Sequence, residues 1–211
     1  MKGFVETPRE RKERFYAASR VYSIDEDWCT PVEYLPYIDA LLGDIDLDPC
    51  TTEKYNKEFI RAKTIYTVKE DGLNIVEPWV GTTYLFAPTY GKCSWNKVRG
   101  TWRWGFKGGP SSMPPTKAWF KRLEREWKLR NVSEALMFST NAECLRSCES
   151  IWDYPVCIPK ERPMLIHGRH LTKVKRPFTW GYFVYLPKLE YGFDQATKFK
   201  EIFSHLGRVI C

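Results

Sequence analysis

The chain has 211 residues, of which 43% are apolar and 28% charged, close to the globular average, so wholesale disorder is excluded. No apolar run approaches the length of a membrane span, and residues 1–15 contain no apolar stretch of signal-peptide length. We therefore expect no membrane partner and a cytoplasmic or nuclear, not a secreted, protein.

The cysteines number seven, and no C-x-x-C pair or finger-type Cys/His spacing occurs. Cys144 and Cys148 are four residues apart on a predicted helix, but two ligands do not hold a structural metal. The sequence therefore predicts no metal site, and reduced thiols are the simpler interpretation of this odd number.

The N-terminal part of the chain contains a polar segment and then a helix signal. Residues 1–25 are charge-rich without a clear period, which predicts a tail or a loose helix. Thr30-Pro31 combines a hydroxyl cap with a proline at the first helical position. We expect this helix to reach about Leu42, to end at Gly43 and to be bent or split by Pro36.

Short strands and helices alternate along the rest of the chain. The predicted strands are 44–50, 64–68, 82–87, 134–139, 155–158, 165–167 and 178–186. The predicted helices are 119–130, 141–152 and 194–205, with Asn141 and Asp194 as N-caps and Gly207 as the final stop. This order favours an α/β fold with a mostly parallel sheet and helices on both faces, in one domain over 26–211.

The net charge of +7 comes from one segment, because residues 78–123 contain eight Lys and Arg and no Asp or Glu. Within it, Trp102, Trp104 and Phe106 alternate as on one short exposed ribbon. Interleaved Trp and Arg can stack bases while neutralising phosphates, so we expect contact with nucleic acid. The alternative is that the Trp side chains fill a core and the Lys and Arg form a solvated rim.

The residues predicted to contact nucleic acid fall in two clusters. The first is in the Trp-rich segment and comprises Lys92, Trp95, Lys97, Arg99, Trp102, Arg103, Trp104 and Lys107. The second, beside His167 and His170, comprises Arg169, Lys173, Lys175 and Arg176. By itself the second cluster is more typical of a solvated loop than of a binding site.

Polar landmarks stand where three predicted strands end. Asp48 ends the first strand, Asp71 lies in the loop after the second, and Ala87-Pro88-Thr89-Tyr90 ends the third. Each alone fits a turn or a helix cap. Because ligands of open α/β sheets bind beyond the carboxyl ends of the strands, the ordered set predicts a site there.

These landmarks resemble those of the phage-type DNA adenine-N6 methyltransferase (Dam) family, whose members are class I S-adenosylmethionine-dependent enzymes with a Rossmann-like fold. The motifs run in the family's order over about 27–211. They are Trp28-Cys29-Thr30-Pro31 for W-x-T-P, Leu47-Asp48-Pro49-Cys50 for the first cofactor motif, Glu70-Asp71-Gly72-Leu73 with Trp79 for D-x-L…W, Phe86 to Tyr90 for the N-P-P-Y region, and Gly168-Arg169 for the late G-R element. Each motif is short, so the resemblance depends on order and spacing.

The resemblance implies S-adenosylmethionine as the cofactor and adenine N6 in DNA, or alternatively in RNA, as the methyl acceptor. It implies that Asp48 and Asp71 accept hydrogen bonds from amino or ribose hydroxyl groups of the cofactor, and that Thr30 and Pro31 line its methionine end. The implied cofactor-binding residues are Trp28, Thr30, Pro31, Asp48, Pro49, Cys50, Asp71 and Leu73.

The chain departs from the family where the chemistry occurs. The family's Asn or Asp and the next backbone carbonyl accept the two N–H bonds of the adenine amino group, and an aromatic residue stacks on the flipped base. Here the carbonyl of Pro88 and the ring of Tyr90 are kept, but Ala87 replaces the Asn or Asp and Thr89 replaces the second Pro. Loss of one positioned acceptor typically costs about 10²–10³ in rate, unless Thr89 substitutes for it.

A second departure is the basic, Trp-rich insertion at about 92–117. Two hypotheses follow. The first is an active methyltransferase, which the retained Asp48, Asp71 and Tyr90 favour. The second is a catalytically inactive relative that binds nucleic acid, as a separate protein or with a protein partner, which Ala87 favours.

Overall fold

The computed structural model describes residues 28–89, 92–96, 100–105, 113–172, 174–177, 179–190 and 192–211, with the side chains of 92, 94–96, 103–105 and 192–194 left out. The predictions for the tail 1–25, for Tyr90 and Phe106, and for the cations Lys97, Arg99, Lys107 and Lys173 lie outside these residues. Among the helices within them, none has the length and apolar character that crossing a membrane requires.

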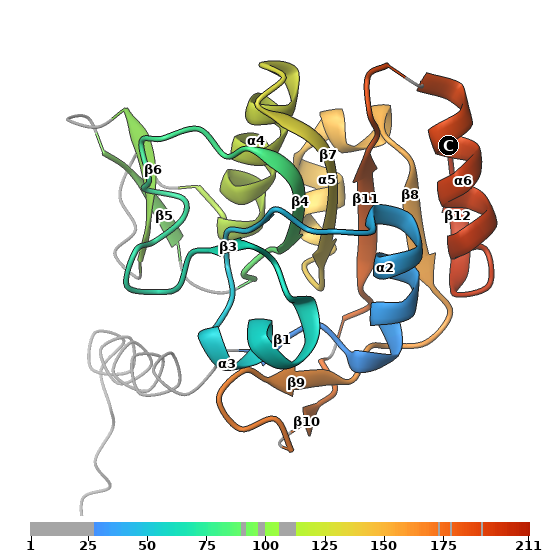
Figure 1. Cartoon of the computed structure of the whole chain (residues 1–211), viewed down its shortest axis with the longest axis horizontal. Coiled ribbons are helices and arrows are strands. Elements are labelled where there is room, and N and C mark those ends of the chain that lie inside the picture. The colour runs from blue at the N-terminus through green and yellow to red at the C-terminus, as the bar shows by residue number, and fades with distance from the viewer. Residues whose placement is uncertain are drawn as a thin grey trace, which may run out of the picture.

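Helices and strands are interspersed along the described residues, with two runs of successive strands, β3 to β6 and β8 to β11 (Figure 1). The helices are η1 (Val32–Tyr34), α2 (Leu35–Leu42), α3 (Glu53–Tyr55), η2 (Asn56–Ile60), α4 (Pro115–Lys128), α5 (Glu143–Ser147), η3 (Glu149–Asp153) and α6 (Gly192–Phe203). The strands are β1 (Trp28–Cys29), β2 (Leu47–Asp48), β3 (Thr64–Ile65), β4 (Gly81–Phe86), β5 (Lys92–Asn96), β6 (Thr101–Gly105), β7 (Val132–Ser139), β8 (Val156–Pro159), β9 (Leu165–His167), β10 (Val174–Lys175), β11 (Tyr182–Leu186) and β12 (Gly207–Ile210).

The main sheet has seven strands in the order β12-β8-β11-β7-β4-β2-β3. The pairings from β7 through β4 and β2 to β3 are parallel, whereas those among β7, β11, β8 and β12 are antiparallel. The α/β class is therefore confirmed, but the prediction of a mostly parallel sheet is wrong for half of it. The reason is the connection from β8 to β11, which in its described residues passes through β9 and β10 without a helix and reverses the direction, so that β11 enters the sheet antiparallel between β7 and β8.

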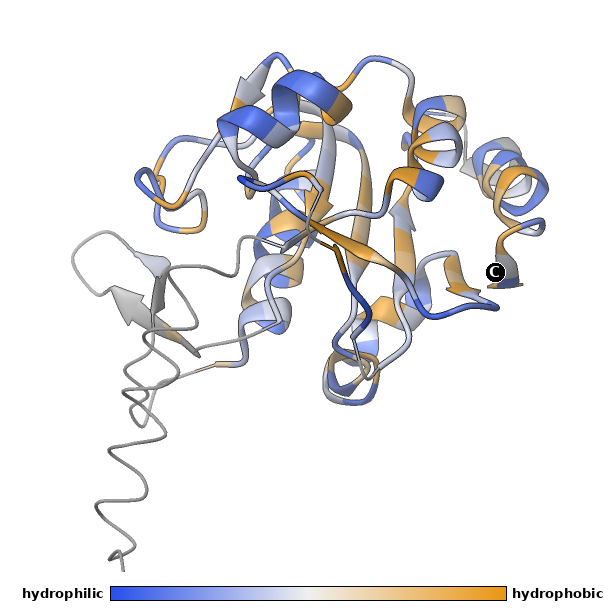
Figure 2. Ribbon diagram, turned by 90° about the horizontal axis from the view of Figure 1, so that it is seen from below, coloured by the Kyte–Doolittle hydropathy of each residue, from blue (hydrophilic) through white to orange (hydrophobic). Residues whose placement is uncertain are grey.

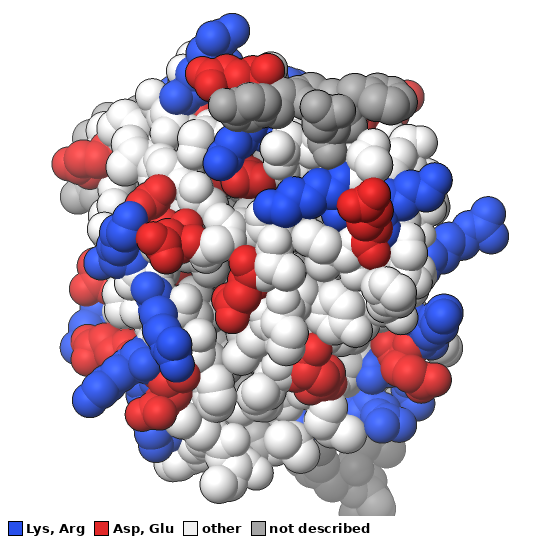
Figure 3. Space-filling model, turned by 45° about the vertical axis from the view of Figure 1, so that its right-hand side comes forward, with Lys and Arg blue, Asp and Glu red and all other residues white. Residues whose placement is uncertain are grey.

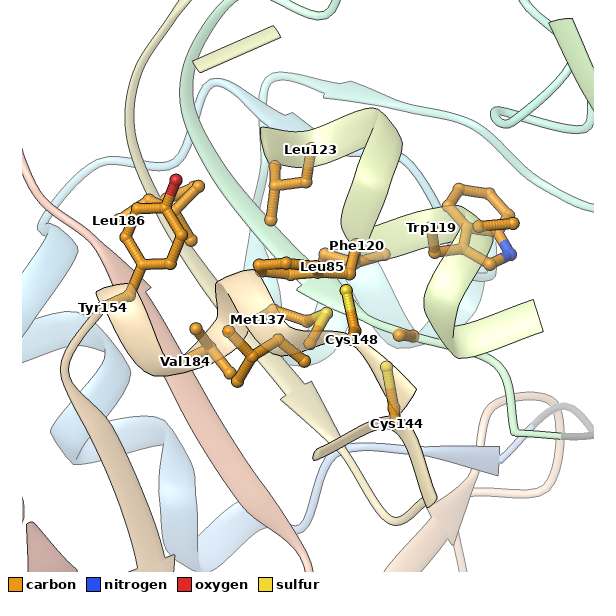
Figure 4. Close-up of a cluster of buried hydrophobic side chains, with 14 of the residues drawn as sticks. Leu85, Trp119, Phe120, Leu123, Met137, Cys144, Cys148, Tyr154, Val184 and Leu186 are labelled. Carbon is orange, nitrogen blue, oxygen red and sulfur yellow. The ribbon is translucent and has the colours of Figure 1, made fainter. Parts of the chain in front are cut away.

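Helices cover both faces of the sheet, as predicted, because its central strands alternate between two apolar clusters. In β7, Met137 faces a cluster with α4 and α5, and Phe138 faces a cluster with α2 and α6. Leu85 and Val184 belong to the first cluster, which Figure 4 shows packed against Trp119 and other residues of α4. In Figure 2 hydrophobic colour is prominent on the central strands, while hydrophilic segments gather on peripheral loops and outer helix surfaces.

Several predicted helix boundaries are confirmed and others shift. Pro36 lies in the first turn of α2 and separates it from η1, and Gly43 ends α2 with a φ of 66°. The side chain of Asn141 accepts a hydrogen bond from the backbone N–H of Glu143, but the predicted helix to residue 152 is broken into α5 and η3. Asp194 does not begin the last helix, because α6 already starts at Gly192.

Two small sheets stand beside the main one. Strand β9 pairs antiparallel with β1 and with β10, so the predicted strand 165–167 belongs to a separate three-stranded sheet. The other is a two-stranded antiparallel ribbon formed by β5 and β6, whose register places Trp95 opposite Trp102 and Cys93 opposite Trp104. The described part of the predicted insertion 92–117 therefore contains a pair of antiparallel strands, and its last residues, from Pro115 on, belong to α4.

Candidate functional site

A cavity of about 310 Å³ lies at the carboxyl ends of the parallel strands β2, β3, β4 and β7. The chain leaves β2 for the edge strand β3 and then returns to β4 on the other side of β2, so the cavity lies at a topological switch point of the sheet. Such a crevice is the usual ligand site of an open α/β sheet. The lining residues are Trp28, Cys29, Pro49, Cys50, Thr51, Thr52, Thr67, Val68, Asp71, Gly72, Phe86, Pro88, Thr89, Trp119, Thr140, Leu165, Lys175 and Pro177.

The loops after β2 and β3 meet closely at one side of this pocket. A Cβ on Gly72 would lie 2.2 Å from the carbonyl oxygen of Pro49, so only glycine allows this approach. Asp71 precedes it in the left-handed region with a φ of 51°, which Asp tolerates better than most residues, and its side chain lines the pocket. Asp71, a predicted cofactor-binding residue, therefore lies in the lining of this cavity.

Asp48 lies beneath the pocket and is not among the residues that line it. Its carboxyl is 2% exposed, and Oδ1 accepts a hydrogen bond from the backbone N–H of Cys50 at 3.1 Å. Burial raises the pKa of this carboxyl to about 7, against the opposing effect of the hydrogen bonds from Cys50 and Thr51. In this structure Asp48 therefore supports the loop of Pro49 and Cys50, which do line the pocket.

Three further residues that the resemblance assigns to cofactor binding, Thr30, Pro31 and Leu73, are buried and do not line the cavity. Thr30 is 1% exposed, its hydroxyl is hydrogen-bonded to the Tyr84 hydroxyl, and its carbonyl accepts a bond from the Tyr55 hydroxyl at 2.6 Å. Pro31 and Leu73 are buried as well. Thr30 thus joins β1 to β4 and α3 and holds the preceding Trp28 and Cys29 at the pocket.

The three described positions of the predicted catalytic set, which follow β4, lie in different surroundings. Ala87 is fully buried in the cluster with α4, whereas Pro88 and Thr89 line the pocket. The carbonyl of Pro88 accepts a hydrogen bond from the Thr116 hydroxyl at 2.9 Å, which leaves one of its two lone pairs for a ligand. The available acceptors at this end of the pocket are therefore the Pro88 carbonyl and the hydroxyls of Thr89 and Thr140.

Trp119 of α4 lies in the lining, and within the described part of the chain its indole N–H has no acceptor. Its side chain is 2% exposed and stacks on Trp79, with 5.8 Å between the ring centroids. The indole Nε1 is buried, and no described residue offers it an acceptor. In Figure 4 this nitrogen lies on the side of the ring turned away from the apolar cluster. A buried N–H of this kind needs a partner from a ligand or from water.

The three-stranded sheet forms another wall of the pocket, through Trp28, Leu165 and Lys175. His167 is fully buried, and its Nδ1 accepts hydrogen bonds from the backbone N–H groups of Arg169 and His170, both at 3.2 Å. A Cβ on Gly168 would lie 2.9 Å from Sγ of Cys29 and 2.8 Å from Oγ1 of Thr52. The G-R element thus packs against the loop after β2 because residue 168 has no side chain.

A second hollow, of about 410 Å³, adjoins the pocket and shares Thr51, Thr52, Thr67 and Val68 with it. Its rim includes three cations and one carboxylate, namely Lys54, Lys69, Arg169 and Glu53. The Lys54 ammonium donates a hydrogen bond to the carbonyl of Arg169 at 3.2 Å. Of the second predicted basic cluster, Arg169 therefore lies in this recess and Lys175 in the main pocket, while Arg176 is exposed.

The Trp-rich ribbon differs from the prediction in two respects. Trp102 is half-buried and packs against the cluster with α4, so it does not stand on an exposed ribbon. Two of the eight cations in 78–123 are structural, because the Lys117 ammonium donates to the carbonyl of Ser147 and the buried Arg122 pairs with Glu126 at 2.8 Å. For Lys92, Trp95, Arg103 and Trp104 the backbone alone is described.

Charge on another face of the molecule is mixed. Over the side that carries α6 and β12, Lys and Arg alternate with Asp and Glu (Figure 3). The described residues contain no group of three or more His, Cys, Asp or Glu arranged to hold a metal ion. The seven cysteines are free thiols, five of them buried.

Several pocket residues escaped sequence reasoning. They comprise Thr51, Thr52, Thr67, Val68, Trp119, Thr140, Leu165 and Pro177. Four of them are threonines at or just after the ends of predicted strands, and a polar residue at a strand end is the signal that could have found them. No protein-family model, curated protein or solved structure matches this chain.

Proposed function

We propose that this protein is an S-adenosylmethionine-dependent methyltransferase with a Rossmann-like fold that acts on adenine N6 in DNA, with RNA as the alternative substrate. The proposal rests on the meeting of several motif segments at one cavity. Segments 28–29, 49–52, 67–72 and 86–89, which contain or adjoin the motifs of the resemblance, line one cavity at the switch point of the sheet. Strand-end loops of a parallel sheet meet at one edge whatever their sequence, so the support comes from the residue types that these segments bring there, above all Asp71 and the threonines.

The residues present fit such a cofactor. The pocket is mainly apolar and includes Phe86 and Pro88, yet it also presents the carboxylate of Asp71 and several threonine hydroxyls, which suit ribose hydroxyl and amino groups. The unused N–H of Trp119 suits a ring nitrogen of an adenine. When bound, the cofactor supplies an electrophilic methyl group on a sulfonium.

At the β4 end, the chain's own residues would orient the base. Pro88 and Thr89 are both in the lining, and the Pro88 carbonyl, held by Thr116, and the Thr89 hydroxyl could each accept one N–H bond of an exocyclic amino group. Such bonds localise the nitrogen lone pair and aim it at the methyl group. Thr89 thus provides the acceptor that Ala87 lacks, although a neutral hydroxyl accepts more weakly than a carboxylate.

A second candidate function is nucleic-acid binding without catalysis, which the burial of Ala87 favours. Its methyl group lies in the core, so no side chain at 87 reaches the pocket. In this case the cationic recess of Lys54, Lys69 and Arg169 and the basic insertion would carry the activity.

Calorimetry with S-adenosylmethionine separates the two functions. We expect binding to the wild type and a loss of about tenfold or more in Asp71→Asn, because a charged hydrogen-bond acceptor is removed. Asp46→Asn is the matched control, since this carboxylate pairs with Lys63 at 2.8 Å and does not line the pocket. Transfer of labelled methyl groups to adenine-containing DNA or RNA oligonucleotides then identifies the substrate. A folded protein that gives no heat with the cofactor but binds DNA in a salt-dependent manner would establish the second function instead.

A further inference from the structure

The wall of the pocket formed by the three-stranded sheet contains a cation on an aromatic ring. The ammonium of Lys175 lies 5.3 Å from the centroid of the Trp28 ring, within the range of a cation–π contact. Both side chains line the pocket, and Trp28 is half-buried. The ring therefore presents a cation-binding face at the place where the proposed cofactor binds.

The register of the small sheet explains this arrangement. Trp28 pairs with His167 across β1 and β9, and Lys175 pairs with Leu165 across β10 and β9. Residues 165 and 167 are two apart, so they share one face of β9 with their two cross-strand partners. Trp28, Leu165 and Lys175 all line the pocket, which makes that face the wall of the cavity.

His167 fixes the orientation of the ring. The two rings meet edge to face, with 5.3 Å between their centroids, and His167 is itself held by two backbone N–H groups. The edge contact leaves a face of the indole for Lys175. An aromatic side chain that is held in this way loses little further freedom when it binds a ligand, and the negative potential of the ring face favours a charged ligand over a neutral one.

We propose that Trp28 recognises the positive charge of the methyl donor, and that Lys175 occupies this face of the ring until the sulfonium replaces it. The inference rests on the proposed function. Methyl transfer converts a sulfonium into a neutral thioether, so a ring that binds cations retains the donor and releases S-adenosylhomocysteine. Trp28 is thereby assigned a role in discriminating donor from product, and Lys175 a role as the competing cation.

The test compares the dissociation constants of S-adenosylmethionine and S-adenosylhomocysteine by calorimetry at fixed ionic strength. Trp28→Leu should lower the preference for the sulfonium ligand by roughly three- to thirtyfold, and Trp28→Phe should restore part of it. Lys175→Met keeps the apolar stem and should raise the preference by about threefold or more. Lys69→Met, in the adjoining recess, removes the same charge and should change the preference by less than about twofold at 0.15 M salt.

The outcomes are distinct. Equal losses for both ligands in Trp28→Leu, or equal effects of Lys175→Met and Lys69→Met, would overturn the inference and leave the proposed function intact. If the wild type binds neither ligand, the proposed function itself fails. Because Trp28→Leu alters β1, Lys175→Met at an exposed strand position provides the independent variant if the first does not fold.

Discussion

In one half of the main sheet, β3, β2, β4 and β7 run parallel, whereas β11, β8 and β12 in the other half alternate in direction. Parallel strands place all their carboxyl ends at one edge, and the four loops that leave this edge line the pocket. Alternating strands distribute their ends over both edges. Strand β11 is buried at every position from Tyr182 to Leu186 and contributes none of these residues to the pocket.

Strand direction, more than composition, therefore distinguishes the half of the sheet whose loops line the cavity from the half that only packs against helices. Both halves are apolar, but the parallel half brings loop residues such as Cys50, Asp71 and Thr89 to one place. The antiparallel half is a packing surface for α6 on one face and for η3 on the other. Substitutions in the two halves should therefore affect different measurements.

The largest effect is expected from Phe183→Ala in β11. Phe183 is fully buried and contacts the rings of Phe138, Phe203 and Tyr34 at centroid distances between 4.7 and 5.3 Å. Removing a buried phenyl ring leaves a cavity, so the free energy of unfolding should fall by about 3–5 kcal/mol in urea titrations. Ligand affinity, measured where the variant is still folded, should stay within about twofold of the wild type. A loss of ligand affinity greater than twofold in the folded variant would show that the two halves of the sheet are coupled.

The second prediction concerns two carboxyl groups near β2 in the parallel half. The pKa of Asp48 is raised to about 7 by burial, so the folded protein holds this proton more tightly than the unfolded chain does. Stability from this group is complete below about pH 4 and is lost as the pH rises to 7, by about 1.4 kcal/mol for each pH unit. Asp48→Asn should abolish this slope and make the protein more stable than the wild type at pH 7.5.

The control for this titration is Asp46→Asn. The hydrogen bond from Lys63 lowers the pKa of Asp46, so its contribution is present at neutral pH and is lost only in acid. Thermal unfolding between pH 4.5 and 7.5 should therefore show the wild-type slope in Asp46→Asn. If Asp48→Asn also keeps that slope, the carboxyl of Asp48 is ionised in the folded state, and its place beneath the pocket must be revised.

The sequence predicted most of the helices and strands of the main sheet and the meeting of the strand-end loops, because these follow from local periodicity and from the geometry of parallel strands. It did not predict the antiparallel half. The continuous apolar run of β11 indicates that both of its faces are covered, but it does not indicate the direction of the neighbouring strands. For the same reason a strand as short as β9 carried no sign that it pairs with β1 and β10.

The sequence also did not show which individual polar residues are buried. Asp48 and Asp71 have the same side chain and both follow or end a strand, yet one supports the loop from below and the other lines the cavity. Arg122 counted as part of a basic patch, but it donates to the carbonyls of Ile75 and Glu77, two residues of a distant loop. Such partners are brought together by the fold, and sequence spacing does not reveal them.

The smallest effects should distinguish two tryptophans of α4. Trp119 lies at the pocket with an unused Nε1, whereas the Nε1 of Trp127 donates to the carbonyl of Pro187, just after β11, at 2.7 Å. Trp119→Phe removes a donor that no described residue accepts from, so it should lower cofactor affinity by about five- to tenfold, as expected for one hydrogen bond. Trp127→Phe should leave cofactor affinity unchanged and reduce the free energy of unfolding by about 1 kcal/mol through its lost bond. For each of the two variants, cofactor affinity is measured by calorimetry and the free energy of unfolding by urea titration. A reversed pattern, with affinity lost at 127 and kept at 119, would mean that the indole donor of α4 faces no ligand and that the division between the two halves does not extend to this helix.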